Sequence, residues 1–347
     1  MNSFIVVLLI VLSLSHAFSA SKGFEGTYTS AQDSKLPKDF KYQGEYTTHN
    51  MGAQVISLGK GNFQVIVYLG GLPGKGWDGN NRSLIDGKLI GEKVKLTPAT
   101  GNRKYLAAPA DQFSATRKFP PNGHQMYHGT ISDKNLFIST GTNSTRLKKI
   151  VRKSPTLGKA PPLGAIVLFD GSNKQEFQGG RLDDSTKLLN TDGKDIRTVR
   201  KFSNYRLHLE FMLPYRPEAR GQGRGNSGLY HIDMYENQIL DSFGLEGLNN
   251  ECGGIYSIKD SKVNACFPPL SWQTYDIDFT NAISKNGKKI KNARVTAWLN
   301  GILIHDNFEI SRKTGGSRRD EEGTHGPLRL QGHGNPLQFR NIWLIKK

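Results

Sequence analysis

Two stretches of the sequence place polar side chains at alternate positions, as on one face of a β-strand. Glu236 and Gln238 alternate in one stretch, and Arg329, Gln331 and His333 alternate in the other. Alternate residues of a strand point to the same face of a sheet. Carboxylate, amide, guanidinium and imidazole groups are suited to fixing sugar hydroxyls, whereas a solvated face favours Lys, Glu and Thr. A solvated sheet face is the alternative for either strand alone, but the residue types favour a polar binding face.

Three of the candidate residues carry groups that can transfer protons. His333 is the first choice for a general acid or base, because histidine exchanges protons near neutral pH. Glu236 is the second choice, and Glu210, on another alternating strand, is expected to share the face. The structural alternative for His333 is that it only ends a strand before the turn at 334–336, which holds Gly, Asn and Pro.

The second half of the chain supplies the strands that would carry these side chains. Residues 206–211 and 273–279 alternate between apolar and polar types. The run 294–299 reaches Asn300-Gly301, a strong two-residue hairpin signal, and continues into 302–304. Many strands separated by turns are typical of a sandwich or jelly roll. We therefore predict an all-β chain whose second half, residues 165–347, is a β-sandwich.

The first half also reads as β structure and carries most of the positive charge. Ala53–Leu58 and Phe63–Tyr68 form a predicted hairpin, and short strands follow at Lys88–Leu96 and Leu136–Ser139. Residues 21–160 hold 21 basic and 9 acidic residues, a surplus of 12, against 26 and 21 in residues 161–347. We predict a small basic β domain over 38–152. Residues 153–164, rich in Pro and Gly, are the predicted linker.

The N-terminus indicates where the protein is located, and the location affects how the two cysteines are interpreted. The apolar run Phe4–Leu14 is too short to span a bilayer and is followed by small residues, as in a signal peptide over residues 1–19. The uncleaved anchor is the alternative. No second apolar run of spanning length follows, so we expect a secreted protein. Because export implies oxidising conditions, we predict a disulfide between Cys252 and Cys266, the chain's 2 cysteines.

Eight ordered blocks of the second half resemble a known family. They are Leu168–Gly171, Asn226–Tyr230, Tyr235–Asp241, Trp272–Ile277, Arg294–Gly301, Ile304–Asn307, Gly326–Pro336 and Phe339–Trp343. In these blocks residues 165–346 resemble the 3-keto-disaccharide hydrolase domain family. The resemblance implies a concanavalin-like or laminin-G-like jelly-roll β-sandwich that acts on sugars.

The same resemblance implies a substrate whose C3 hydroxyl has been oxidised to a ketone. That ketone acidifies the C2 hydrogen, so a base can remove it and the enolate can expel the anomeric substituent. The site then needs a base, an oxyanion stabiliser and an acid for the leaving oxygen. An ordinary glycosidase mechanism with two carboxylates is the alternative.

Substrate contacts are expected from five residues. Arg329 and Gln331 would hold hydroxyls or the developing oxyanion, Tyr256 would stack on the sugar ring, and Asn226 and Gln238 belong to the matching blocks.

Other functions remain open from the sequence. The sandwich could be a lectin-like carbohydrate-binding module without catalysis, because a fold does not fix a function. The basic half could bind an anionic polysaccharide; it lacks the motifs of nucleic-acid binding, so no nucleic acid is expected. A divalent metal could polarise the ketone, but no residue spacing specifies a metal site, and no cofactor is certain.

Overall fold

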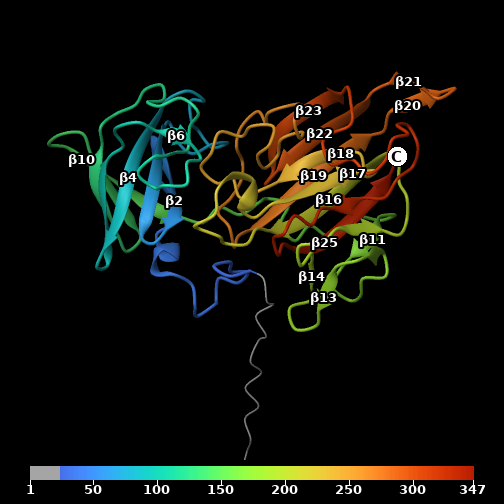
Figure 1. The fold of residues 1–347 in the computed structure, drawn as a ribbon, viewed down its shortest axis with the longest axis horizontal. Coiled ribbons are helices and arrows are strands. Elements are labelled where there is room, and N and C mark those ends of the chain that lie inside the picture. The colour runs from blue at the N-terminus through green and yellow to red at the C-terminus, as the bar shows by residue number, and fades with distance from the viewer. Residues whose placement is uncertain (1–23) are drawn as a thin grey trace, which may run out of the picture.

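The structure is a computed structural model that describes residues 24–347; the predicted signal peptide lies outside this range. The chain is all-β, as predicted, and forms a closed barrel followed by an eight-stranded and a five-stranded sheet (Figure 1). The closed barrel has the strand order β1-β10-β9-β8-β5-β4-β3-β2. Its strands are β1 (Gly44–Thr48), β2 (Met51–Gly59), β3 (Asn62–Leu69), β4 (Arg82–Ile90), β5 (Lys93–Pro98), β8 (His128–Ser132), β9 (Asn135–Ser139) and β10 (Ser144–Ile150).

Short elements flank these strands. A 3-10 helix at Lys38–Lys41 precedes the barrel, and β6 (Lys104–Tyr105) pairs in parallel with β7 (Phe113–Ser114) between β5 and β8. The β2–β3 hairpin confirms the predicted one. The predicted strand Lys88–Leu96 is wrong: Gly91, in the left-handed region at φ +59°, turns the chain between β4 and β5. The run is therefore the end of one strand and the start of the next.

The second half forms an eight-stranded and a five-stranded sheet. The first has the order β13-β14-β25-β16-β19-β22-β23, with β11 beside β25, and the second has the order β12-β15-β24-β17-β18. The strands of the first are β11 (Ile166–Phe169), β13 (Arg181–Asp183), β14 (Leu188–Asn190), β16 (Tyr205–Met212), β19 (Trp272–Thr280), β22 (Ala293–Leu299), β23 (Ile302–Ile310) and β25 (Gln338–Lys346). The strands of the second are β12 (Phe177–Gln178), β15 (Ile196–Thr198), β17 (Ser227–His231), β18 (Tyr235–Ile239) and β24 (Arg329–Leu330), with a 3-10 helix at Gly221–Gly223.

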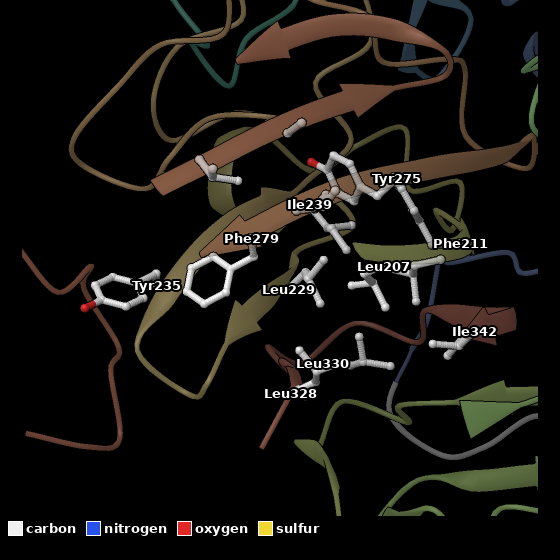
Figure 2. Packing of buried hydrophobic residues seen from close by; sticks show 14 of the residues in the cluster. Leu207, Phe211, Leu229, Tyr235, Ile239, Tyr275, Phe279, Leu328, Leu330 and Ile342 are labelled. Carbon is white, nitrogen blue, oxygen red and sulfur yellow. The ribbon is translucent and has the colours of Figure 1, made fainter. Parts of the chain in front are cut away.

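The main core lies between these two sheets. Leu207 and Phe211 from β16 are in the same buried cluster as Leu229 from β17 and Leu330 from β24 (Figure 2). The alternation predicted for residues 206–211 is thus confirmed. The two sheets bury their apolar faces against each other, so their outer faces are the surfaces available for a site.

The barrel and the sheets share a smaller core. Phe243 and Leu245, in the loop after β18, are buried in one cluster with Ile56 and Leu58 of β2 and neighbouring barrel residues. Between them, Gly244 leaves no room for a side chain, because a Cβ there would lie 2.6 Å from Ile56 Cδ1. The two halves of the chain are therefore packed together through apolar side chains.

Residues 153–164 contain no helix or strand and lie against the outer face of the eight-stranded sheet. Ser154 Oγ is 2.6 Å from Thr274 Oγ1, and Thr156 Oγ1 donates to Asp276 Oδ2 (2.6 Å). Lys159 O accepts from the Trp343 indole N–H (3.2 Å). These hydrogen bonds hold the segment over side chains of β19 and β25.

The shared core leads to a stability prediction. Replacing Phe243 with Ala should lower the free energy of unfolding by about 3–5 kcal/mol, because it leaves a cavity between the barrel and the loop. Urea unfolding followed by tryptophan fluorescence measures the change. Val151→Ala, at a side chain that is 78% exposed, is the control and should shift stability by less than about 0.5 kcal/mol. Equal shifts for both variants would contradict the shared core.

Candidate active site

The candidate site lies on the outer face of the five-stranded sheet. Tyr230 of β17 is the register partner of both Glu236 of β18 and Arg329 of β24. Antiparallel pairing places directly opposed side chains on the same face, so the three residues form one row across the sheet. Their neighbours Leu229 and Leu330 point the other way, into the core. Two of the residues in the row, Glu236 and Arg329, were predicted to share a polar face.

Glu236 is the buried carboxylic acid of this row. Its side chain is 2% exposed, and Oε2 lies 2.6 Å from the Tyr230 hydroxyl. Burial raises the pKa of Glu236 to about 7, although the hydrogen bond with Tyr230 and the charge of Arg329 oppose the shift. Gly228 makes room for the carboxylate, since a Cβ at that position would lie 2.1 Å from Oε1. Oε1 accepts no hydrogen bond from the described residues and is not among their fully enclosed polar atoms.

The hydroxyl of Tyr230 has two acceptors within reach and only one proton. Besides Glu236 Oε2, the carbonyl oxygen of Gly315 lies 2.8 Å away. Both contacts are satisfied together when Glu236 is protonated and donates to Tyr230 while Tyr230 donates to Gly315. When Glu236 ionises, Tyr230 can turn its proton to the carboxylate. The pair can therefore take up and release a proton near neutral pH while the hydrogen bond between Glu236 and Tyr230 is kept.

Tyr230 was not predicted as a site residue. Its aromatic side chain suggested a place in the core or on the sheet surface, and the sequence offers no direct sign of its hydrogen bond. A signal was nevertheless present, because Gly228 and Tyr230 alternate in β17 as Glu236 and Gln238 do in β18. Glycine has no side chain, so a strand with Gly and Tyr on one face leaves room above the glycine. A carboxylate from a neighbouring strand that carries Glu and Gln can lie there.

Arg329 lies beneath this pair and has no exposed surface for a ligand. Its guanidinium stacks on the Tyr230 ring, with Cζ 3.7 Å from the ring centroid. Nη2 donates to Gly316 O (2.6 Å) and Nη1 to Asp195 Oδ2 (3.3 Å). Nε lies 2.5 Å from Asp233 Oδ1, an ion pair without the alignment of a hydrogen bond. Because Arg329 is 0% exposed, the structure places it as a support for Tyr230, not at the predicted substrate contact.

Side-chain amides lie on the same side of the sheet as Glu236. Gln238 Nε2 donates to Gln222 Oε1 (3.1 Å), and Asn226 Nδ2 donates to the same oxygen (3.0 Å). Asn226 is 2% exposed, and its buried Oδ1 has no partner among the described residues. Gln331 Nε2 approaches the Tyr230 hydroxyl at 3.4 Å, its only described contact. The predicted residues Asn226, Gln238 and Gln331 thus lie on the same side of the sheet as Glu236. The carbonyl oxygen of the Asn226 side chain and the amide nitrogen of Gln331 can each form further hydrogen bonds.

The predicted residue Tyr256 also lies beside this strand. Its main-chain N–H donates to Glu236 O (3.2 Å), and its side chain is half-buried. A Cβ on Gly315 would lie 3.1 Å from the Tyr256 ring. The ring therefore borders the same segment, 315–316, that receives the hydrogen bonds of Tyr230 and Arg329.

Glu210 does not share this face, and that prediction is wrong. It lies on the outer face of the other sheet and is 0% exposed beneath residues 153–164. Its carboxylate accepts hydrogen bonds from Gly158 N (2.5 Å), Asn341 Nδ2 (2.9 Å) and Arg340 Nε (2.7 Å). Burial alone would raise the pKa of Glu210, but hydrogen bonds, first from His208, lower it to about 2. A permanently ionised, fully paired carboxylate is structural.

His333 lies at a bend after β24 and is exposed. Its carbonyl oxygen accepts a hydrogen bond from Asn335 Nδ2 (3.0 Å), but its imidazole makes no hydrogen bond with any described residue. It follows Gln331 by two residues, so it stands on the segment that leaves the candidate site. The structure does not link its ring to Glu236.

The predicted disulfide is absent, because Cys252 and Cys266 are free thiols in the structure. Both are fully buried, and Cys266 Sγ donates weakly to Phe267 O (3.4 Å). Burial, first, and the neighbouring Cys252 raise the pKa of the Cys266 thiol well above its ordinary value. We expect alkylation of protein unfolded without reductant to label two thiols, as mass spectrometry would show. An unlabelled protein that gains two labels only after reduction would contradict this expectation.

A second polar face, on the eight-stranded sheet, has less to offer for catalysis. An open groove of about 670 Å³ there is lined by Trp298, Trp343 and neighbouring residues. Its carboxylates are paired, Asp276 with His208 (2.8 Å) and Asp278 with Arg206 (3.1 Å). Paired carboxylates are poor bases, so this groove is a weaker candidate than the Glu236 face.

Residues 24–347 contain no group of three or more His, Cys, Asp or Glu side chains arranged to hold a metal ion. In the same range no helix is long and apolar enough to cross a membrane.

Comparison with known proteins assigns the second half. Residues 164–345 match the model of the 3-keto-alpha-glucoside-1,2-lyase-like domain. The chain belongs to this family. The match agrees within one residue at each end with the resemblance inferred over 165–346, and it contains every residue of the Glu236 face. Among curated proteins none matches the sequence.

Solved structures also resemble this family domain. A crystal structure of a provisionally assigned glycosyl hydrolase from Parabacteroides distasonis is 30% identical, with a TM-score of 0.50, and the match covers 54% of this chain and 85% of that one. A second such protein from the same organism is 20% identical, with a TM-score of 0.39, over 53% of this chain and 94% of that one. The family and the first of these neighbours support a carbohydrate-active enzyme.

Proposed function

We propose that the chain cleaves the glycosidic bond of 3-keto-glycosides by elimination, with Glu236 as the base. The observation that carries the proposal is a buried carboxyl group with a pKa near 7. One of its oxygens is held by Tyr230, and the other accepts no hydrogen bond from residues 24–347. A base that is partly ionised at neutral pH, yet still strong enough to accept a carbon-bound proton, matches the task.

The proposed reaction begins with transfer of the C2 proton to Glu236 Oε1. The electron pair of the C2–H bond moves towards the C3 ketone and forms an enolate. Gln331, whose amide has a spare donor, is proposed to hold the enolate oxygen. Asn226 Oδ1, buried and without a partner in the described part of the chain, is proposed to accept a hydrogen bond from a sugar hydroxyl.

In the second step the enolate re-forms the ketone, a C1–C2 double bond appears, and the C1–O bond breaks. The leaving oxygen needs a proton, and we propose His333, exposed on the segment after Gln331, as its donor. Addition of water across the double bond, with OH to C1 and a proton to C2, then gives the free 3-keto-sugar.

The fold and the location complete the proposal. We propose that the two packed sheets are the concanavalin-like jelly roll implied by the family. Secretion is proposed from residues 1–19 alone. Tyr256, half-buried at the edge of the face, is proposed to stack on the sugar ring.

A direct assay tests the function. The full chain is incubated with a 3-keto-α-glucoside and, separately, with the unoxidised glucoside, and release of the aglycone is followed. We expect release from the keto-sugar alone, because only the ketone makes the C2 hydrogen acidic. Comparable binding of both sugars without release would favour a lectin-like module, and release from both would favour an ordinary glycosidase.

A further inference from the structure

The outside of the barrel carries a row of basic side chains fixed by strand register. Lys88 of β4 is opposite Lys95 of β5, which is opposite Thr130 of β8. Thr130 is opposite Phe137 of β9, and Phe137 is opposite Arg146 of β10. We call these five residues the basic row.

The members of the basic row point outwards. Lys88, Lys95, Thr130 and Arg146 are exposed, and Phe137 is half-exposed. Their chain neighbours Val94, Leu96, Leu136 and Leu147 are buried in the barrel core. Since neighbouring strands lie about 4.8 Å apart, the four steps from Lys88 to Arg146 extend over about 19 Å of the surface.

The positive charges of the row have no described counter-charge. Lys88 donates to Asn62 Oδ1 (2.9 Å) and Arg146 to Asn135 Oδ1 (2.8 Å), both neutral amides. No carboxylate among residues 24–347 forms a salt bridge with Lys88, Lys95 or Arg146. The buried carboxylate of Glu45, in the barrel, pairs instead with Arg152. Like charges placed directly opposite on a sheet are unfavourable. The pairing of Lys88 with Lys95 therefore has a cost that a bound anion would relieve.

Nearby groups strengthen the same positive field. Lys93 and Lys148 are exposed on the adjoining positions of β5 and β10, and Lys134 lies in the β8–β9 turn. Acidic residues close along the chain are Asp86, which pairs with Arg103, Glu92, which pairs with Lys38 and Lys41, and Asp133 in the β8–β9 turn.

We propose that the basic row binds an anionic polysaccharide, with sulfate or carboxylate groups on the lysines and arginine and a sugar ring against Phe137. The row crosses five strands of the closed barrel and so curves with its surface, which a flexible linear polyanion can follow. One aromatic ring among cations suits a sugar ring. Binding of single-stranded nucleic acid usually adds several stacked aromatic side chains, and this row has one. Figure 1 shows β10 at the end of the molecule away from the sandwich, so a polymer held there leaves the Glu236 face open. The proposal is independent of the catalytic one.

Charge reversal in the full chain tests the proposal. The variant K88E/K95E/R146E is compared with K285E/K288E/K291E, which reverses three exposed lysines of the β20–β21 hairpin (Ile283–Lys285 and Lys288–Lys291) in the sandwich half. We expect wild type and the hairpin variant to bind heparin at 0.1 M salt and to release it as salt rises. The row variant should bind about tenfold more weakly or worse, with an unchanged melting temperature and unchanged keto-sugar turnover.

Two further measurements identify the ligand. Phe137→Ser should weaken heparin binding while leaving its salt dependence unchanged, because it removes a ring and no charge. Polygalacturonate should bind and neutral dextran should not. The proposal is wrong if both triple variants lose heparin equally, or if wild type ignores heparin. It is also wrong if duplex DNA or phosphatidylserine vesicles bind wild type more tightly than the polysaccharides do at the same ionic strength.

Discussion

Glu236→Gln is expected to lower turnover of a 3-keto-glycoside by about 10² to 10⁴, the range attributed to general acid–base groups. Glutamine keeps the shape of the side chain and can donate to the Tyr230 oxygen as the protonated acid does. Tyr230 would then still donate to Gly315 O, 2.8 Å away. The variant therefore removes the proton acceptor and retains the architecture. Initial rates at saturating substrate measure the effect.

Glu251 supplies a matched control for this prediction. Burial also raises the pKa of Glu251 to about 7, but its carboxylate accepts hydrogen bonds from Gly247 N (2.6 Å), Leu248 N (3.0 Å) and the Tyr105 hydroxyl of the barrel. Glu251→Gln should leave turnover within a few-fold of wild type. Similar losses in the two variants would show that a buried carboxyl is needed for folding and not for proton transfer.

The raised pKa of Glu236 also predicts how stability depends on pH. Between pH 4.5 and about 7 the folded protein binds a proton at Glu236 that the unfolded chain has released. Stability from this group therefore falls as pH rises through that window. Gln cannot ionise, so Glu236→Gln should be more stable than wild type at pH 8, by about 3 kcal/mol, with little difference at pH 4. Thermal melts at both pH values check the sign. A variant less stable than wild type at pH 8 would contradict a pKa raised by burial of the carboxyl group.

Strand alternation predicted the part of the site that depends on local geometry. It correctly paired Glu236 with Gln238 on one face and placed Leu207 and Phe211 in the core. It could not separate the two sheets, because a period of two residues says which side of a strand a residue takes and nothing about which sheet that strand joins. Glu210 was assigned to the wrong surface for this reason.

Contacts between distant segments could not be predicted at all. The burial of Glu210 depends on Gly158, and the place of Tyr230 depends on Gly315, 85 residues further along the chain. Neither segment has a periodic pattern that reveals its position. The disulfide prediction was wrong for a different reason. It was inferred from the expected compartment, but the chain buries both cysteine side chains as thiols in an apolar cluster.

Arg329→Leu is the prediction that best separates support from substrate binding. Leucine fills part of the buried space but removes the charge that faces Asp233 and Asp195. Breaking a buried ion pair by removing one partner costs about 3–5 kcal/mol. Arg197, which also contacts Asp233 (2.9 Å) and Asp195 (3.2 Å), remains, so the lower end of that range is expected. Urea unfolding measures the loss.

The kinetic effect of the same variant should differ from that of a lost substrate contact. Without the guanidinium under its ring and the hydrogen bond to Gly316 O, Tyr230 no longer holds Glu236 in one place, so kcat should fall while KM changes little. A residue that binds substrate would instead raise KM and leave stability nearly unchanged. Adding Asp233→Asn to Arg329→Leu removes one of the two carboxylates that have lost their positively charged partner. The second substitution should therefore recover part of the stability and should not recover kcat. Recovery of kcat together with stability would mean that Arg329 acts only on folding. An increase in KM alone would support the prediction from the sequence that Arg329 contacts the substrate.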